Sequence, residues 1–216
     1  LKKFRSEIFS GDLLILFFSI VLAVTSISSV GFLADRLQSS MQMQASSILG
    51  ADLVLRSASE IDSKYLELAA VNDLNSAQTI TFLSMVLTDD DNLLASIKAA
   101  TDSYPLRGEL RVINFDGIPI QHSGSPPSGF IWIERKLSDS LGLNQSDKVS
   151  IGNKNLIVEG IIEDYPDRNS SFVGFYPIAI VNINDVDEMG VIQTGSRVVY
   201  RKLFSGTQDN LDRYEK

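Results

Sequence analysis

Few of the residue types that usually carry catalysis or bind metals occur in this chain. Its 216 residues include no cysteine and one histidine, His122. A thiolate zinc site, a cysteine nucleophile and a two-histidine metal cluster are therefore excluded. His122 lies in a connector rich in proline, glycine and serine, where a lone imidazole is typical of a solvated loop and not of a general base. We expect no catalytic residue, no metal and no cofactor in this chain.

Two groups of acidic residues could bind a cation or act as paired carboxylates. Residues 89–91 are three consecutive aspartates, but they lack the glycine and the closing glutamate of an EF-hand loop. A solvated hairpin tip explains them. Glu163, Asp164 and Asp167 surround Pro166. A turn between strands explains this second group with fewer assumptions than acid–base chemistry.

Other ligand-binding patterns are absent or have a simpler interpretation. The chain contains neither GxxxxGK[ST] nor GxSxG, so it has no P-loop and no serine hydrolase elbow. Its net charge of -8 is opposite to that of a phosphate-tracking surface, and nucleic acid is not an expected partner. The aromatic residues Phe130, Trp132, Phe172 and Phe175 could line a lipid-binding cleft, but the default expectation is that they belong to the core.

An uncharged stretch near the beginning of the chain, residues 13–34, indicates a transmembrane helix. A helix of this length is about 33 Å long, which is enough to cross a hydrocarbon core of about 30 Å. A cleaved signal peptide is the alternative, with a shorter apolar run of about 7–15 residues and a small-residue cleavage site. The length of the run favours the retained helix, as does Asp12, which interrupts the basic flank.

The distribution of basic residues predicts the orientation of this helix. Lys2, Lys3 and Arg5 precede it, whereas only Arg36 lies close after it. Positively charged flanks stay on the cytoplasmic side. The amino terminus is therefore expected in the cytoplasm, and everything from Asp35 onward on the other side of the membrane.

One face of the predicted transmembrane helix carries small and hydroxyl side chains. Such a face lets another helix approach closely and offers hydrogen bonds across the contact. The alternative is that each hydroxyl bonds the carbonyl four residues earlier in its own helix. This candidate helix-packing face comprises Ser19, Ala23, Thr25, Ser26 and Ser29.

Apolar residues at intervals of three and four continue beyond the membrane segment. Leu37, Met41, Ala45 and Ile48 predict that the helix extends as an amphipathic stalk. Gly50 is expected to end it. A rigid stalk would transmit a displacement of the membrane helix to whatever follows, whereas a plain packing helix on the surface of the domain is the simpler alternative.

The remainder of the chain alternates strands and helices, which indicates an α+β domain. Residues 77–87 and 93–99 predict a hairpin around the acidic tip, and Asp116–Gly117 predicts the turn of a second one. Prolines, glycines and serines in residues 122–129 indicate a subdomain boundary. Strands are expected at residues 52–57, 109–113, 118–121, 130–133, 148–151, 155–163, 177–183 and 196–203. One helix is expected to open with Ser59 followed by Asp62, a short helix to lie around residues 137–141, and a helical turn capped by Asn184 to end at Gly190.

Several segments resemble, in order, the YbbP-like ABC transporter permeases, which are relatives of the MacB, LolC/LolE and FtsX group. The most specific is YPLRGEL, which begins with Tyr104, Pro105, Leu106, Arg107 and Gly108. The other similar segments are GFLADRL (31–37), LGADLVL (49–55), AQTITFLSMV (77–86), SIKAATDSYPLRGELRV (96–112), IWIERKLSDSLGLNQSDKVSIG (131–152), EDYPDR (163–168) and GSRVVYRKL (195–203).

The resemblance implies a domain plan in a bacterial inner membrane protein. A single transmembrane helix over residues 13–34 would follow a cytoplasmic segment, residues 1–12. A MacB-like periplasmic domain would come next, with an α/β porter-like part over residues 35–125 that begins with the stalk helix, residues 35–49. A β-rich sabre-like part is expected over residues 126–190. Residues 191–216 would return into the porter-like part, where the chain is expected to be truncated.

The resemblance also implies a function, that of a permease subunit of a MacB/FtsX-type ABC transporter. Such a subunit would couple ATP hydrolysis to conformational change of its periplasmic domain, for export or extraction of hydrophobic or lipid-like molecules. ATP and magnesium would be bound by a cytoplasmic ABC ATPase partner, and a periplasmic thioesterase or lysophospholipase is a further implied partner. The residues alone leave a bitopic sensor or adaptor without an ATPase as the main alternative, and a membrane-anchored hydrolase as a weaker one.

Overall fold

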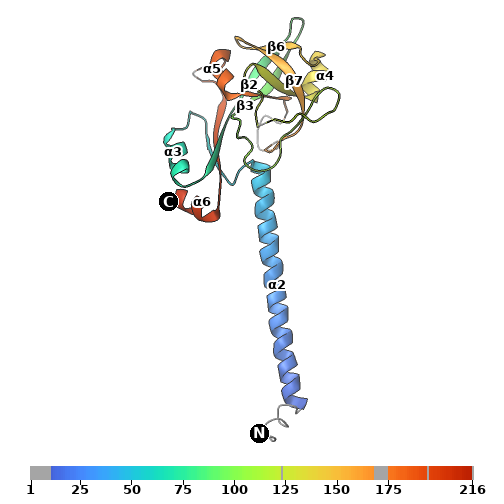
Figure 1. Ribbon diagram of the computed structural model, residues 1–216, viewed down its shortest axis with the longest axis vertical. Helices are drawn as coiled ribbons and strands as arrows, with labels where there is room; N and C mark the ends of the chain where they lie inside the picture. Colours follow the sequence, from blue (N-terminus) through green and yellow to red (C-terminus); the bar gives the residue numbers. More distant parts are fainter. Residues whose placement is uncertain (1–10, 123, 168–174, 194, 216) are drawn as a thin grey trace. The chain divides into compact units, whose positions relative to one another are not determined.

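The computed structural model, drawn in Figure 1, describes residues 11–122, 124–167, 175–193 and 195–215. The chain divides between Ala45 and Ser46 into two units. The helices are α2 (Gly11–Leu49), α3 (Lys64–Val71), α4 (Arg135–Leu141), the 3-10 helix η1 (Ile183–Asp185), α5 (Val186–Met189) and α6 (Gln208–Tyr214). The strands are β1 (Leu53–Ser57), β2 (Asn75–Leu87), β3 (Asn92–Ala100), β4 (Arg111–Ile113), β5 (Phe130–Glu134), β6 (Lys148–Ile151), β7 (Lys154–Asp164), β8 (Ile178–Asn182) and β9 (Val198–Ser205).

Helix α2 is a single α-helix of 39 residues that contains the predicted transmembrane segment. Its stretch Ile15–Gln38 has a mean hydropathy of 2.2 over 24 residues, which is long and apolar enough to cross a membrane. Large apolar side chains such as Leu22, Ile27 and Phe32 are exposed. The predicted stop is confirmed, because Gly50 follows the helix with φ +75°, a conformation that favours glycine.

Among the described residues of the second unit, nine strands form one mixed sheet. The strand order is β1-β9-β2-β3-β8-β5-β7-β4, and β6 pairs with both β2 and β7. The β3–β8 and β5–β7 pairs are parallel, and the others are antiparallel. Because β6 joins β2 to β7, the strands β2, β3, β8, β5, β7 and β6 close into a ring, which leaves β1, β9 and β4 outside it.

The largest hydrophobic cluster draws on every strand of this ring. Alternate residues of a strand face opposite sides of a sheet. In β5, Ile131 and Ile133 belong to this cluster, whereas Trp132 belongs to a second cluster on the other side. All three side chains are fully buried. Both faces of β5 are therefore covered, which explains its uninterrupted apolar sequence.

The predicted hairpin of the two long strands is confirmed. Strands β2 and β3 pair antiparallel from Leu87 and Asn92 at the tip to Thr79 and Ala100 at the base. The three aspartates lie at the tip, where the Asp91 N–H donates to the Thr88 hydroxyl at 2.9 Å. The acidic tip is thus part of a turn, as its composition indicates.

The proposed porter-like and sabre-like division stays a prediction. The closed ring includes β2 and β3 from the first predicted part and β5 to β8 from the second. Parallel pairing of Ser96–Ala100 with Ile178–Asn182 joins the two parts directly. The second unit, from Ser46 onward, is compact across the predicted boundaries.

Three local predictions differ from the structure, and one helix was missed. The cap of the turn before Gly190 is Asn182, whose side chain accepts a 3.1 Å hydrogen bond from the Asn184 N–H. Residues 118–121 form only an isolated bridge, Ile113 to Pro119, and not a strand. Helix α3 begins at Lys64, after Ser59 and Asp62. Helix α6 was not predicted, although Thr207 caps it with its hydroxyl.

Candidate functional site

The last turn of α2, within the second unit, is held by two loops of the domain. The backbone N–H groups of Leu106 and Arg107 donate to the carbonyl of Gly50 at 2.9 and 3.0 Å. The Asp167 N–H donates to the carbonyl of Ile48 at 2.6 Å. Carbonyls at the end of a helix lack partners within it, and the two loops supply them. We call residues 104–108 and 166–167, together with the helix end 46–52, the helix clasp.

An ion pair reinforces the first loop of the clasp. The Arg107 guanidinium donates to both carboxylate oxygens of Asp52, at 2.8 to 3.1 Å. The Gly206 N–H, just after β9, donates to the same carboxylate at 3.2 Å. Burial alone would raise the pKa of Asp52, but hydrogen bonds from Arg107, Gly206 and Ser46 outweigh it and lower that pKa. The bidentate geometry thus ties the loop to the start of β1.

Gly108 is required where the loop passes the helix. Its φ is +77°, and a Cβ atom there would lie 2.7 Å from the carbonyl oxygen of Ser47. Both the backbone conformation and the close approach exclude other residues without a local shift. The glycine of the YPLRGEL segment therefore allows the loop to lie against the end of α2.

The Tyr104 side chain joins the two loops of the clasp. Its side chain is 1% exposed, and the Tyr104–Pro105 peptide bond is cis. The phenol donates to the carbonyl of Pro166 at 3.3 Å and lies 3.2 Å from the ammonium of Lys98. Burial, followed by the charge of Asp167, raises the pKa of Tyr104 well above its usual value. The phenol consequently stays a neutral hydrogen-bonding group.

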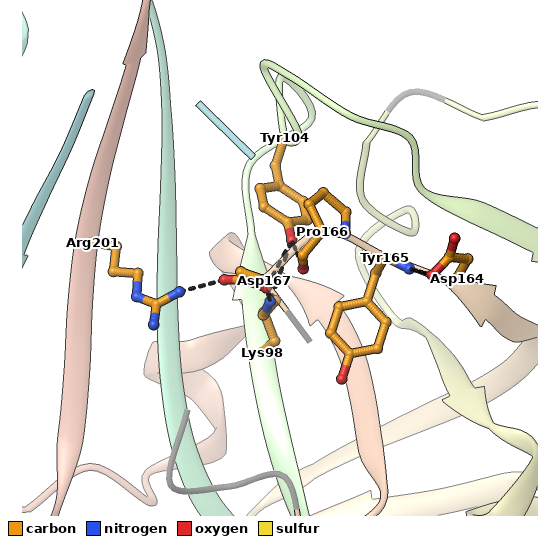
Figure 2. A network of polar contacts seen from close by, with 7 residues as sticks. All are labelled: Lys98, Tyr104, Asp164, Tyr165, Pro166, Asp167 and Arg201. Atoms are coloured by element: carbon orange, nitrogen blue, oxygen red, sulfur yellow. Dashed lines mark hydrogen bonds and ion pairs between the residues drawn. The ribbon is translucent and has the colours of Figure 1, made fainter. Parts of the chain in front are cut away.

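Asp167 lies at the centre of a buried ionic cluster (Figure 2). Its carboxylate accepts hydrogen bonds from Lys98 of β3 and Arg201 of β9. Burial lowers the pKa of Lys98, and the charge of Asp167 counteracts part of this effect. The φ of Asp167 is +61°, an uncommon conformation outside glycine. Strained backbone at a buried charge is the kind of feature that marks a functional position.

The contacts of Asp167 connect the helix end to the sheet. Asp167 binds the helix end through its backbone and two strands through its carboxylate. Lys98 also lies over the rings of Tyr104 and Tyr165, at 5.3 and 4.9 Å from their centroids. Within the described residues, no group of three His, Cys, Asp or Glu side chains could hold a metal ion. The clasp is a set of directional bonds between a helix end and a sheet.

The family segment at residues 104–108 thus lies in the clasp, while the other predicted residues lie along α2. The stalk residues Leu37, Met41, Ala45 and Ile48 are exposed, and the lever role of the stalk stays a prediction. The helix-packing face Ser19, Ala23, Thr25, Ser26 and Ser29 is also exposed. In it, the Thr25 hydroxyl donates to the Val21 carbonyl at 2.7 Å, which is the alternative we stated for this face.

The prediction of a solvated His122 is wrong. The imidazole is half-buried, with its ring centroid 4.3 Å from that of Trp132. Its Nδ1 atom is buried without a hydrogen-bond partner among the described residues. Burial lowers the pKa of His122, and the charge of Glu159 opposes this shift. Glu159 also accepts a 2.8 Å hydrogen bond from the Trp132 indole. The local composition indicated a loop, but a loop can pack against a core.

The aromatic and acidic predictions are partly confirmed. Trp132 is fully buried and Phe130 half-buried, but Phe175 is 87% exposed, so its expected place in the core is wrong. Phe172 lies outside the described residues. Among the acidic residues around Pro166, Asp164 pairs with Arg111 at the surface, at 3.1 Å. Asp167, by contrast, is buried, which a simple turn does not explain.

Sequence reasoning missed the two cations of the ionic cluster. Lys98 interrupts the apolar end of β3 in SIKAA, and Arg201 and Lys202 interrupt that of β9 in VVYRKL. A charge in the middle of a buried strand requires a partner of opposite charge. This signal was available, but the partner, Asp167, lies 69 positions after Lys98 and could not be assigned from spacing.

No protein-family profile matches the chain, but one curated protein does. The uncharacterized ABC transporter permease YbbP of Escherichia coli K12 is 32% identical over 215 residues, which cover 100% of this chain. The chain is a homologue of an ABC transporter permease. It spans about a quarter of the length of that relative, 26%. The matched region therefore corresponds to one part of the longer permease.

The fold is similar to that of solved transporter domains. The extracellular domain of the ABC-type transporter YknZ from Gram-positive bacteria matches with a TM-score of 0.52 and 11% identity, over 74% of this chain and 80% of that chain. The periplasmic region of MacB from Actinobacillus actinomycetemcomitans matches with a TM-score of 0.44 and 9% identity, over 64% and 62% of the two chains. The match to the YknZ domain confirms the predicted fold, an apolar helix followed by a mixed α/β domain of this type.

Proposed function

We propose that this homologue of the YbbP permease forms the first membrane helix and the extracytoplasmic domain of a MacB/FtsX-type ABC transporter. The observation that carries the proposal is the 32% identity with YbbP over the entire chain. In this proposal the amino terminus is cytoplasmic and the main domain periplasmic, in a bacterial inner membrane. The basic residues before Ile15–Gln38 support that orientation.

In the proposed mechanism, ATP hydrolysis by a separate cytoplasmic ATPase subunit moves the membrane helices, and the periplasmic domain changes shape in response. The stalk acts as the lever, and the helix clasp binds the end of the stalk helix to the domain. Displacement of the last turn would pull on Asp167 and, through its carboxylate, on Lys98 and Arg201. The proposed cargo is hydrophobic or lipid-like, handed to a periplasmic thioesterase or lysophospholipase.

The partner is tested by purifying the full-length protein that contains this chain from its native membrane with an affinity tag. We expect an ABC ATPase to copurify and to hydrolyse ATP with magnesium. If no ATPase is recovered and the full-length protein instead carries a signalling module, the proposal is wrong and the bitopic sensor is correct.

The lever is tested by inserting two glycines after Ser40, within the stalk. Glycine is the residue that most weakens a helix interior after proline, so the insertion should interrupt rigid transmission. We expect ATP hydrolysis to continue while export is lost. The same insertion at the exposed turn between Asp116 and Gly117 is the control and should leave export intact. Unchanged export with the Ser40 insertion would contradict the lever.

A further inference from the structure

A cavity of about 490 Å³ is lined by residues of β2, of β9 and of the segment that leads into α3. In β9, Arg201 pairs with Thr79 of β2, and Lys202 pairs with Gln78. Directly paired residues share a face, and adjacent residues point to opposite faces. Arg201 therefore points toward Asp167, while Lys202 and Gln78 point toward the cavity. Residues 60–63, before α3, form its other wall.

The base of the cavity holds a buried ammonium group with unused hydrogen-bonding capacity. Lys202 is 4% exposed, and its Nζ donates to the backbone carbonyl of Asp62 at 2.8 Å. Among the described residues no carboxylate forms an ion pair with it. An ammonium group has three donors, so two remain for a ligand. Burial lowers the pKa of Lys202, and Asp62 and Glu60 counteract this effect.

Further polar groups around the cavity are also unused. The Gln78 amide, the Tyr200 hydroxyl, the Ser63 hydroxyl and the Glu60 carboxylate line it, and none makes a side-chain hydrogen bond to another described residue. Gln78 and Tyr200 are half-buried, and half-buried polar groups without partners carry a free-energy cost that a ligand or ordered water would remove, whereas Ser63 and Glu60 are exposed and accessible to a ligand. Apolar side chains fill the gaps between them.

The charged groups around the cavity indicate which class of ligand it could bind. An ammonium at the base favours an anionic group such as a phosphate or a carboxylate. A simple anion would also be repelled by the carboxylates of Glu60 and Asp62. The Asp62 carboxylate is engaged by Lys64, through its N–H at 2.9 Å and its ammonium at 3.6 Å, but that of Glu60 is available for a cation.

We propose that this cavity binds a zwitterion, with its anionic group on Lys202 and Gln78 and its amine on Glu60. The ligand would be either a free small molecule or the headgroup of a lipid, since both can present an amine close to a phosphate. The site lies in the extracytoplasmic domain itself. This binding proposal is independent of the proposed transport function. The cavity could bind the ligand whether or not an ATPase copurifies with the full-length protein.

The experiment uses the whole chain in a nonionic maltoside detergent and calorimetric titration with three probes. O-phosphoethanolamine carries both charges, inorganic phosphate only the anion, and ethanolamine only the amine. We expect O-phosphoethanolamine to bind at least about tenfold more tightly than either single-charge probe, as one charge-assisted hydrogen bond is sufficient for this difference. Equal binding of phosphate and O-phosphoethanolamine, or no binding of any probe, would overturn the proposal.

Variants test the assigned roles. Glu60→Gln should weaken O-phosphoethanolamine about tenfold and leave inorganic phosphate no weaker. Glu67→Gln, an exposed change in α3 away from the cavity, is the matched control and should have no effect. Lys202→Met should abolish binding of both, and Gln78→Leu provides a second test in case Lys202→Met does not fold. Unchanged binding in Glu60→Gln and Gln78→Leu would refute the assignment.

A final arm distinguishes the two sources of the ligand. Dihexanoyl phosphatidylethanolamine, added below its micelle concentration, presents the same headgroup with short acyl chains. Tighter binding of this lipid than of O-phosphoethanolamine would indicate a lipid headgroup, supported by the apolar part of the cavity. Weaker binding would indicate a free zwitterion.

Discussion

The backbone N–H of Asp167 and the carbonyl of Ile48 are joined by a 2.6 Å hydrogen bond at the end of helix α2. The carboxylate of the same aspartate binds Lys98 and Arg201, in two strands of the sheet. One residue thus links the helix end to β3 and β9. Because the carboxylate is buried, its links to β3 and to β9 both depend on its charge, which leads to the first prediction.

Replacing Asp167 with asparagine should lower the free energy of unfolding by about 3–5 kcal/mol, because two buried cations lose their carboxylate. Asparagine tolerates a positive φ, so the backbone conformation is retained and the loss reports the charge. Chemical denaturation of the chain in detergent measures it. Asp164→Asn is the control, since its pair with Arg111 is about half exposed and should contribute at most about 1 kcal/mol. Similar losses in both variants would contradict the central role of Asp167.

Gly108→Ala should open the clasp, because the new methyl group would meet the Ser47 carbonyl at 2.7 Å. Hydrogen exchange of the Leu106 and Arg107 amides, which bond Gly50, should become faster. Gly117→Ala is the matched control. Its φ is +81°, but nothing lies within 4 Å of the added atom. Backbone strain of about 1 kcal/mol is common to both variants, and only Gly108→Ala should expose the clasp amides. Equal exchange in both would argue against the close approach.

The Asp52–Arg107 pair predicts a dependence of stability on acid pH. The pKa of Asp52 is lowered in the folded state from its ordinary value of 3.8. Its contribution is therefore complete above that value and is lost as the pH falls through the folded-state pKa. Arg107→Gln should cost about 1 kcal/mol near neutral pH, because the arginine side chain is 43% exposed. The difference from the unmodified chain should shrink below pH 3.8, as measured by urea unfolding. A difference independent of pH would contradict the ion pair.

His122 predicts a second pH dependence, of separate origin. Its pKa is lowered by burial from the ordinary 6.5, so the unfolded chain takes up a proton first as the pH falls. Stability should therefore decline below pH 6.5 until the folded-state pKa is reached, and His122→Gln should remove that slope. Because the chain has one histidine, its proton resonance can be titrated directly. Glu159→Gln should lower the pKa further, since Glu159 favours the charged imidazole. A pKa at or above 6.5 would refute the burial argument.

Many elements of this fold could be predicted because their signals are local. The apolar run within Ile15–Gln38, the helix stop at Gly50 and the β2–β3 hairpin each follow from residues adjacent in sequence. Hydrophobic periodicity and turn residues act over the same short range that defines a helix or a hairpin. Where the local signal was weak, as at Asn184 or in residues 118–121, the prediction was wrong.

The helix clasp could not be predicted from local sequence signals. The segment YPLRGEL was singled out by resemblance, but its role depends on Ser47, Gly50 and Asp52, more than fifty positions earlier. The carboxylate of Asp167 suggested an ordinary turn, and Lys98 and Arg201 were not predicted at all. Their pairing depends on which strands lie beside each other, which the order of β9, β2 and β3 decides.

By itself, the sequence determined that an apolar helix precedes an acidic α+β domain without thiol chemistry, because hydrophobic spacing and composition act within each segment. Only the tertiary structure decided that β6 closes six strands into a ring, that Asp167 links the helix end to two strands, and that Lys202 lies beside an open cavity. The physical reason is that a buried charge is stabilised by whichever partner the fold brings near, however far apart the two are in the chain.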